Sequence, residues 1–264
     1  MKRLTTLFRF YFVVLSILSL TLSCDESNPL DFDTSGLKNI HIGIYSDNGT
    51  TNVEEVESML SQMNCNYSRI NKETIIDNEL ENYDLILFPG GDMWEYKNDL
   101  YPTGVSNLKS FVQHGGGYIG ICGGSYFAAS TIVWRGWADE PRTYLTISGL
   151  GFLKGYADGP IEDFAPTYQV ENCDVTINKN HPVTNDVSDR LDYLYSFGPK
   201  FIISDSSDVT VLGRTSTGNN NVVLAIEYYE GKVFLTALHP EFDDNRTSWK
   251  MIRNAIMWCI GSEL

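Results

Sequence analysis

The chain has 264 residues, 42% of them hydrophobic, and 34 acidic against 19 basic side chains give it a formal net charge of −15. This acidity argues against nucleic acid as a partner and against electrostatic docking on anionic lipid. The length suits one large domain with a substantial core, and the ordinary hydrophobic content argues against disorder except near the start.

The first 23 residues have the pattern of a signal peptide. Three basic residues precede an apolar stretch, 10–22, that is too short to span a bilayer comfortably. A small residue then precedes Cys24, which resembles the lipobox of bacterial lipoproteins and implies a lipid on Cys24. We therefore expect a protein of the cell envelope, anchored to the membrane through Cys24. Ordinary secretion, to the periplasm or beyond, is the first alternative, and a retained membrane anchor is the second.

The residues after Cys24 are expected to link that anchor to the folded domain. Residues 24–38 are polar, with one proline and one glycine, and are typical of a short tether. The domain itself is predicted over 39–264. Removing residues 1–23, which carry three basic and no acidic side chains, would leave a net charge of −18.

The first half of the domain alternates strands with helices. The hydrophobic pattern predicts the following elements in chain order: a strand over 39–45, a helix over 52–63, strands over 66–70 and 83–88, a helix around 105–112, and a strand that leads into Cys122. Such alternation indicates a mainly parallel sheet with right-handed crossovers.

The second half is less regular at first. Residues 131–199 are rich in glycine, proline and aromatic residues, and loops with short strands are expected there, around the active-site end. A β-meander is then predicted over 209–214, 222–229 and 233–238, followed by a closing helix from Trp249 to Cys259. The fold class is therefore α/β: a single doubly wound, mainly parallel and flavodoxin-like sheet, with flanking helices and a C-terminal meander.

Glycines surround Cys122 at the point where a strand is expected to turn sharply into a helix. The stretch Gly117-Tyr118-Ile119-Gly120-Ile121-Cys122-Gly123-Gly124 has the pattern of a nucleophile elbow, whose strained backbone and close packing tolerate little beyond glycine. At a helix N-terminus the dipole favours a thiolate. A buried structural cysteine in a glycine-rich turn is the simpler interpretation of the same residues.

His239 and Glu241 supply what a cysteine nucleophile needs. A thiol requires a base, and the base requires an orienting carboxylate. The two residues are two apart, so in an extended segment their side chains would point to the same side. We therefore predict that Cys122, His239 and Glu241 form a catalytic set. The alternative is a histidine at a strand end beside a solvated glutamate.

Three motifs together resemble a known family. They are Phe88-Pro89-Gly90-Gly91, Gly117 to Phe127, and His239-Pro240-Glu241-Phe242. They resemble the class I glutamine amidotransferase-like fold, and more closely the N-terminal domain of some biotin–protein ligases, over essentially the whole mature domain. The resemblance implies Cys122 as nucleophile, His239 as base, Glu241 as orienting acid, and the backbone N–H groups of Gly91 and Gly123 as an oxyanion hole. Two such donors could contribute about 3–4 kcal/mol each.

Tyr126 departs from the resemblance. Glutamine-hydrolysing members usually carry glutamine four residues after the cysteine, where this chain has Tyr126. The chain also shows no synthetase domain and no biotin ligase catalytic domain, so we expect neither glutamine amidotransfer nor biotin transfer from it. Gly90, Tyr126 and Trp134 are predicted to border a substrate pocket.

Three functions remain open at this point. The first is a cysteine-dependent hydrolase of an amide, peptide or ester, acting on an unidentified small-molecule or peptide substrate. The second is a ligand-binding or scaffold lipoprotein that keeps the fold without turnover. The third is a redox role for Cys122.

The remaining cysteines and histidines suggest no further chemistry. Cys65, Cys173 and Cys259 are an odd number and form no disulfide framework, although one pair could bridge. The spacing of histidine, cysteine and aspartate suggests no metal site, and we expect no cofactor.

Overall fold

The computed structural model describes residues 30–136, 145–163 and 170–262. The predicted signal peptide over 1–23 and the predicted lipidation site at Cys24 lie outside these residues, as do residues 137–144 and 164–169 of the less regular segment 131–199. Within the described part of the chain, no helix is both long and apolar enough to cross a bilayer.

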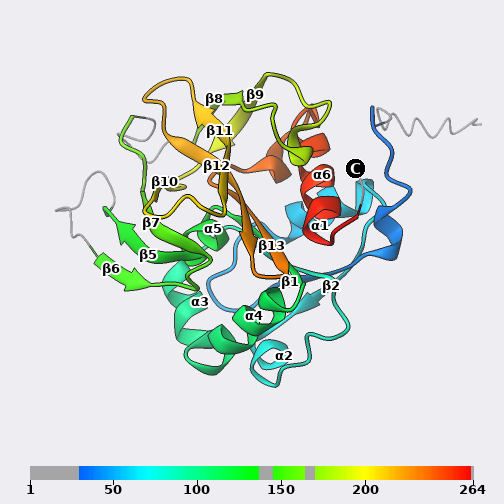
Figure 1. Ribbon diagram of the computed structural model, residues 1–264, viewed down its shortest axis with the longest axis vertical. Coiled ribbons are helices and arrows are strands. Elements are labelled where there is room, and N and C mark those ends of the chain that lie inside the picture. The colour runs from blue at the N-terminus through cyan, green and yellow to red at the C-terminus, as the bar shows by residue number, and fades with distance from the viewer. Residues whose placement is uncertain (1–29, 137–144, 164–169, 263–264) are drawn as a thin grey trace, which may run out of the picture.

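A nine-stranded sheet forms the centre of the molecule (Figure 1). Its strands follow the order β2-β1-β3-β4-β13-β12-β11-β8-β9, and the five from β2 to β13 run parallel to one another, whereas the remaining pairs are antiparallel. The bounds are β1 (His41–Tyr45), β2 (Asn66–Ile70), β3 (Leu85–Phe88), β4 (Gly117–Ile121), β8 (Glu171–Ile177), β9 (Arg190–Tyr195), β11 (Val209–Thr215), β12 (Asn221–Tyr228) and β13 (Gly231–Thr236).

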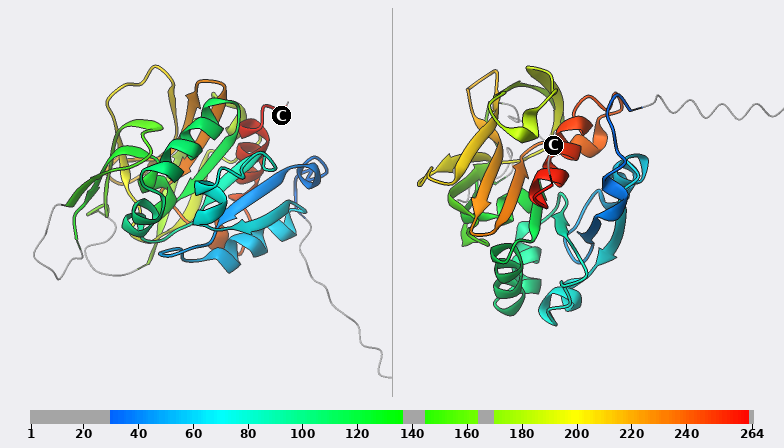
Figure 2. Two further views of the ribbon diagram at one scale, coloured as in Figure 1. Left: turned by 90° about the horizontal axis from the view of Figure 1, so that it is seen from below. Right: turned by 45° about the vertical axis from the view of Figure 1, so that its right-hand side comes forward.

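Helices cover both faces of this sheet, which is why its central strands are apolar throughout. Every residue of β3 and β4 is buried, as expected for parallel strands packed on both sides. Helices α1 and α6 cover one face, and α2 to α4 the other (Figure 2). The bounds are α1 (Val53–Gln62), α2 (Lys72–Ile76), α3 (Met93–Leu100), α4 (Thr103–Gln113), α5 (Gly123–Phe127) and α6 (Trp249–Cys259), with short 3-10 turns η1 (Leu37–Asn39), η2 (Pro182–Thr184) and η3 (Pro240–Phe242).

A second, four-stranded sheet stands beside the first (Figure 1). Its order is β10-β7-β5-β6, and its strands are β5 (Ala129–Trp134), β6 (Leu145–Ser148), β7 (Leu153–Gly159) and β10 (Lys200–Ile203). Both β5 and β7 contact α5, so this sheet is packed against the short helix that follows Cys122.

The α/β class and the large sheet with flanking helices are confirmed, and the meander and closing helix are where the pattern predicts them. The expectation of a single sheet is wrong. Residues 131–199, where loops with short strands were expected, contribute strands to both sheets, and β7, β8 and β9 largely alternate buried and exposed residues. The helices α2 and α3 were not predicted, since both are short; each begins at a side-chain cap, Asn71 and Asp92 respectively.

Part of the predicted tether belongs to the domain instead. Leu30 and Phe32 pack against the core, and Leu37 is fully buried. Helix α6 holds this segment, because Arg253 donates through Nε to the carbonyl of Asp33 at 3.0 Å. Apolar side chains within a mostly polar segment explain why it folds against the domain.

Candidate active site

Cys122 occupies a strained turn between β4 and α5. Its backbone has φ 46° and ψ −103°, which is unusual for any residue other than glycine. The neighbouring glycines are required by close packing: a Cβ on Gly120 would lie 2.7 Å from the carbonyl oxygen of Gly124, and one on Gly124 would collide with the carbonyl of Phe88. The glycine pattern around Cys122 therefore has the steric cause that the sequence suggested.

Gly91 and Gly123 meet directly beside the cysteine. Gly91 has φ 142°, and a Cβ on Gly123 would lie 2.6 Å from the Gly91 nitrogen. Among the residues that the structure describes, the N–H groups of Gly91 and Gly123 have no hydrogen-bond acceptor. Two buried phenols hold the backbone next to these glycines. Tyr96 donates to the carbonyl of Gly90 at 2.7 Å, and Tyr118 donates to the carbonyl of Gly124 at 2.8 Å.

His239 and Glu241 are in contact, as predicted, but on a different local structure. The His239 Nδ1 lies 2.7 Å from Glu241 Oε1, and both side chains are almost completely buried. The segment is not extended here: Pro240 to Phe242 form the 3-10 turn η3, and the Trp249 indole donates to the carbonyl of Pro240 at 2.9 Å. The other oxygen of Glu241 has no partner among the described residues, so the carboxylate is directed at His239.

The opposite edge of the imidazole faces Cys122. Burial alone would lower the pKa of His239, but the charges of Glu241 and Cys122, together with hydrogen bonds to both side chains, raise it well above its usual value. The carbonyl of Ser196 completes this group: the Cys122 thiol donates to it at 3.3 Å, and His239 Nε2 lies 3.4 Å from the same oxygen.

A cavity of about 650 Å³ opens over Cys122. One wall is aromatic, with the Trp134 ring 6.0 Å from that of Tyr126 and 6.5 Å from that of Trp94. The lining residues are Gly49, Thr51, Asn52, Gly91, Asp92, Met93, Trp94, Cys122, Tyr126, Trp134, Ser196, Phe197 and His239. Tyr126 and Trp134, two of the predicted pocket residues, thus line this cavity, whereas Gly90 lies against the His239 ring, with Cε1 3.1 Å from a Cβ built on it.

Tyr126 has a structural partner that its position in the motif did not suggest. Its hydroxyl donates to the carbonyl of Phe197 at 2.9 Å, and its side chain is 1% exposed. Burial is the largest of the effects that raise the pKa of Tyr126 well above its usual value, so it stays a neutral donor.

Several cavity residues carry no sequence signal that marks them as functional. Ser196 and Phe197 come to Cys122 through the connection between β9 and β10, and the one local hint is the Gly-Pro pair that follows them. Asp92 and Trp94 follow the glycine pair of the first motif, where Asp92 caps α3 by accepting the Trp94 N–H at 2.8 Å. An N-cap aspartate after that motif could have indicated α3.

The remaining cysteines are free thiols in the structure. Cys65, Cys173 and Cys259 form no disulfide with one another. Over the described ranges, no group of three histidine, cysteine or acidic residues lies close enough to hold a metal ion. His181 caps η2, where its Nδ1 accepts the Val183 N–H, and its ring contacts that of Trp258.

Comparison with known proteins identifies the family. The family described as "Biotin-protein ligase, N terminal" matches residues 40–257 of this chain. The chain belongs to this family.

Two curated relatives agree with the assignment. An uncharacterized protein of Chlamydia muridarum is 30% identical over 135 residues, which is 47% of this chain and 51% of that protein. A biotin–protein ligase of Schizosaccharomyces pombe is 27% identical over 172 residues, which is 60% of this chain and 25% of that protein. The chain thus matches about half of one relative's length and a quarter of the other's.

The solved structures similar to this member of the biotin–protein ligase N-terminal family include glutamine amidotransferase-like folds. A glutamine amidotransferase from Thermotoga maritima has a TM-score of 0.54 at 14% identity, and the match covers 84% of this chain and 99% of that one. At this identity the likeness shows the fold, which is the glutamine amidotransferase-like fold predicted from the motifs.

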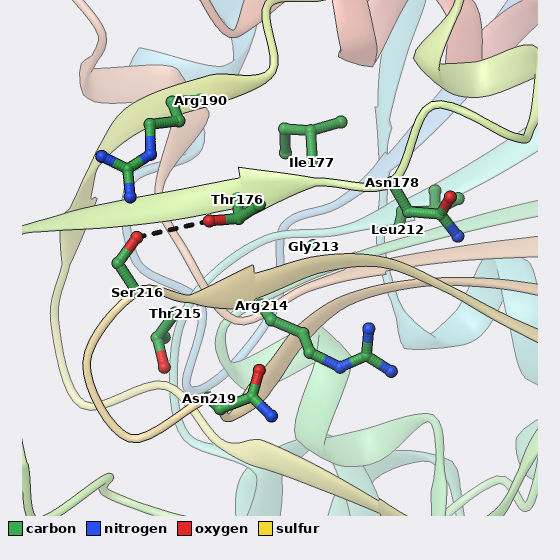
Figure 3. A pocket seen from close by; sticks show the side chains of 10 residues that line it. All are labelled: Thr176, Ile177, Asn178, Arg190, Leu212, Gly213, Arg214, Thr215, Ser216 and Asn219. Carbon is green, nitrogen blue, oxygen red and sulfur yellow. Dashed lines mark hydrogen bonds between the residues drawn. The ribbon is translucent and has the colours of Figure 1, made fainter.

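This family member has a second hollow, between β8 and β11, of about 310 Å³ (Figure 3). It shares no lining residue with the cavity over Cys122. Its arginines have polar partners at the surface: Arg190 lies 3.5 Å from Asp174, and Arg214 donates to Asn221 at 3.0 Å. The residues that line it are Thr176, Ile177, Asn178, Arg190, Leu212, Gly213, Arg214, Thr215, Ser216 and Asn219.

Proposed function

We propose that this protein is a cysteine-dependent hydrolase of an amide, peptide or ester, with Cys122 as nucleophile, His239 as general base and acid, and Glu241 as its orienting carboxylate. The observation that supports it best is the buried group in which Glu241 lies 2.7 Å from one nitrogen of His239, while the Cys122 sulfur and the other nitrogen of His239 both approach the carbonyl oxygen of Ser196, at 3.3 Å and 3.4 Å. Structural histidines do not require a buried carboxylate on one side and a thiol on the other.

The chemistry follows from these positions. His239 takes the proton of the Cys122 thiol, and the sulfur attacks the substrate carbonyl carbon to form a tetrahedral intermediate. The negative oxygen that develops would be met by the N–H groups of Gly91 and Gly123, worth about 3–4 kcal/mol for each donor. Protonation of the leaving group by His239 then breaks its bond to carbon and leaves a thioester on Cys122, which water hydrolyses with His239 as base.

The first test is the reactivity of the thiol. Treatment of the purified protein with iodoacetamide near neutral pH is expected to alkylate Cys122 at least about tenfold faster than glutathione reacts, and mass spectrometry would locate the label. Cys65 serves as an internal control, because burial raises its pKa to about 12. Labelling of Cys122 no faster than glutathione would contradict an activated nucleophile.

The second test is turnover. Incubation with an activated ester, 7-acetoxy-4-methylcoumarin, is expected to release the fluorescent coumarin and to add an acetyl group to Cys122 that mass spectrometry detects. The Cys122→Ser variant should release none above the spontaneous rate. Equal release by both proteins would count against catalysis at this site.

A non-catalytic binding protein is the second candidate, favoured by the aromatic wall of the cavity. Trp94 and Trp134 are partly exposed and offer an apolar surface beside Cys122, with the buried ring of Tyr126 packed near Trp134. A binding role predicts that Cys122→Ser leaves the protein's biological function intact, whereas Trp134→Ala removes it. Catalysis predicts that both substitutions remove it.

For location, we propose that the protein is a lipoprotein of the cell envelope, anchored through Cys24 after removal of residues 1–23. The sequence pattern before Cys24 supports this proposal. Labelling of cells with radioactive palmitate should mark the protein, and Cys24→Ala should both abolish the label and release the protein from the membrane fraction. A labelled Cys24→Ala variant would refute the assignment.

A further inference from the structure

Three of the four residues that join β9 to β10, Ser196, Phe197 and Gly198, form a strap that passes beside the nucleophile. Two buried phenols fix it. The Tyr126 hydroxyl donates to the carbonyl of Phe197 at 2.9 Å, and the Tyr195 hydroxyl donates to the carbonyl of Gly198 at 2.8 Å. Two consecutive carbonyls of the strap are thus held by different elements. Tyr126 lies in α5, which packs against the small sheet, and Tyr195 lies at the end of β9 in the large sheet.

The strap is also strained and tightly packed. Phe197 has φ 58°, a left-handed conformation that bulky residues rarely adopt. A side chain on Gly198 would collide with the carbonyl of Ala237, two residues before His239. The His239 N–H in turn donates to the carbonyl of Leu194 at 3.0 Å. Strain that persists beside a reactive group indicates that the surrounding structure holds the strap in place for a purpose.

The strap places the Ser196 carbonyl beside both the nucleophile and the base. Its oxygen is 3.3 Å from the Cys122 sulfur and 3.4 Å from His239 Nε2. A carbonyl oxygen can accept but never donate a hydrogen bond. Beside the nucleophile and the acid there is therefore a fixed acceptor, whereas the proposed oxyanion hole at Gly91 and Gly123 presents fixed donors.

We propose that the Ser196 carbonyl accepts an N–H of the leaving group, so that this site is selective for amides that carry an N–H over esters and N,N-disubstituted amides. The proposal deepens the proposed hydrolase function and depends on it. The leaving atom must come within about 3 Å of His239 Nε2 to receive its proton. It thereby comes close to the Ser196 oxygen, which lies 3.4 Å from the same nitrogen.

An amide nitrogen and an ester oxygen differ at that point in one respect. The nitrogen of a primary or secondary amide carries a hydrogen that Ser196 can accept, whereas the ester oxygen presents lone pairs to the lone pairs of the carbonyl. In the step itself, the Cys122 sulfur bonds to the acyl carbon, the carbon–nitrogen bond breaks with its electron pair moving to nitrogen, and His239 supplies the proton. Ammonia or an amine leaves, and the thioester remains.

Three probes with the same acetyl group test the selectivity in the wild-type protein: 7-acetamido-4-methylcoumarin, its N-methyl derivative, and 7-acetoxy-4-methylcoumarin. Each kcat/KM is divided by the rate of hydrolysis of that probe by hydroxide, which removes intrinsic reactivity. The acetamide is expected to exceed the N-methyl amide and the ester by at least about tenfold on this scale, the worth of one hydrogen bond. An N-methyl amide accelerated as much as the acetamide would overturn the proposal.

A pair of tyrosine variants tests the strap. Tyr126→Phe removes the donor to Phe197 and is expected to reduce the acetamide rate about tenfold more than the ester rate. Tyr193→Phe is the matched control, because the Tyr193 hydroxyl, in the same strand as Tyr195, is buried with no partner among the described residues. It should leave both rates within twofold of wild type. Equal losses on amide and ester in Tyr126→Phe would assign Tyr126 to general stability instead.

The outcomes separate this proposal from the hydrolase function. Ester turnover through Cys122 without any preference for N–H amides would overturn the role of Ser196 and leave the hydrolase intact. Failure of all three probes, together with slow alkylation of Cys122, would overturn both.

Discussion

Two hollows of the described structure, the cavity over Cys122 and the hollow between β8 and β11, differ in how their polar groups are held. Around Cys122 the groups are buried, held by partners from several elements, and placed on strained backbone at Cys122 and Phe197. Between β8 and β11 the arginines extend from neighbouring strands into solvent, where Arg190 has a side-chain exposure of 67%. The first arrangement costs stability to maintain, and the second costs almost nothing.

That difference supports the proposal that the chemistry takes place in the cavity over Cys122 and not in the hollow between β8 and β11. Chemistry needs groups whose positions and charges the fold dictates, because catalytic effects fall steeply with small displacements. At the exposed hollow, the charge of an arginine is screened by water and salt, and its side chain is free to move. Substitutions in the two hollows should therefore have effects of very different size.

The largest effect is expected from loss of the nucleophile. Cys122→Ala should reduce kcat for the coumarin ester by about 10⁴-fold or more, because no other group in the cavity can form the acyl intermediate. The measurement is steady-state release of coumarin. Cys65→Ala is the control and should leave kcat unchanged. Retained activity in Cys122→Ala would contradict the assignment of Cys122 as the nucleophile.

Glu241→Gln should reduce kcat by about 10³-fold and shift its pH dependence. The carboxylate opposes the effect of burial on His239, so without it the pKa of His239 falls. The alkaline limb of the kcat–pH profile, where the imidazolium loses its proton, should move to lower pH. Glu227→Gln, on the exposed side of β12, should change neither quantity. A profile that does not move would show that Glu241 does not set the charge of His239.

Gly123→Ala should reduce kcat by about 10²-fold, through loss of one oxyanion donor's geometry. The new methyl group would lie 2.6 Å from the Gly91 nitrogen. It would therefore push the N–H groups of Gly91 and Gly123 apart. Gly115→Ala is a control for substitution of a glycine away from the cavity, since Gly115 has a positive φ, of 103°, and open space where a Cβ would lie. It should cost stability, about 1 kcal/mol, without loss of kcat. Similar kcat values for the two variants would remove Gly123 from the site.

The raised pKa of His239 also predicts how stability depends on pH. A group whose pKa is higher in the folded state stabilises the fold fully below its unfolded pKa, near 6.5 for histidine. This contribution is lost as the pH rises through the folded value. Urea unfolding at a series of pH values should therefore show wild type losing more stability toward alkaline pH than Glu241→Gln. Parallel curves would contradict the direction of the shift.

The smallest effect is expected at the exposed hollow. The double substitution of Arg190→Ala and Arg214→Ala should leave kcat within twofold and the free energy of unfolding within about 0.5 kcal/mol of wild type, because exposed pairs contribute little. Thermal unfolding and coumarin release measure both. A large loss of activity would mean that the two hollows communicate.

The sequence predicts the parts of the site that depend on local geometry. The glycines around Cys122 and the spacing of His239 and Glu241 are constraints within a few residues, and the structure brings all three side chains together. Ser196 could not be found in the same way. Its contribution is a backbone carbonyl, which every residue has, and its position depends on how β9 crosses to the small sheet.

The same limit applies to the fold. The apolar strands β3 and β4 were predictable because burial on both faces leaves an unbroken hydrophobic run. The small sheet was not, because β7 pairs with β5 and with β10 across long separations in the sequence, and β6 and β7 follow one another without pairing. Alternation in β7 could have indicated a strand, but not its partner.

The packing of the first described residues against the domain would limit how far the proposed active site can lie from a lipid anchor. The segment from Leu30 onward is fixed to α6, so a lipid on Cys24, as proposed, would be separated from the folded domain by six residue steps. At full extension these span about 20 Å, less than the width of the domain itself. The cavity would then stay within a thin layer at the membrane surface. A substrate would have to lie close to the bilayer or diffuse to it.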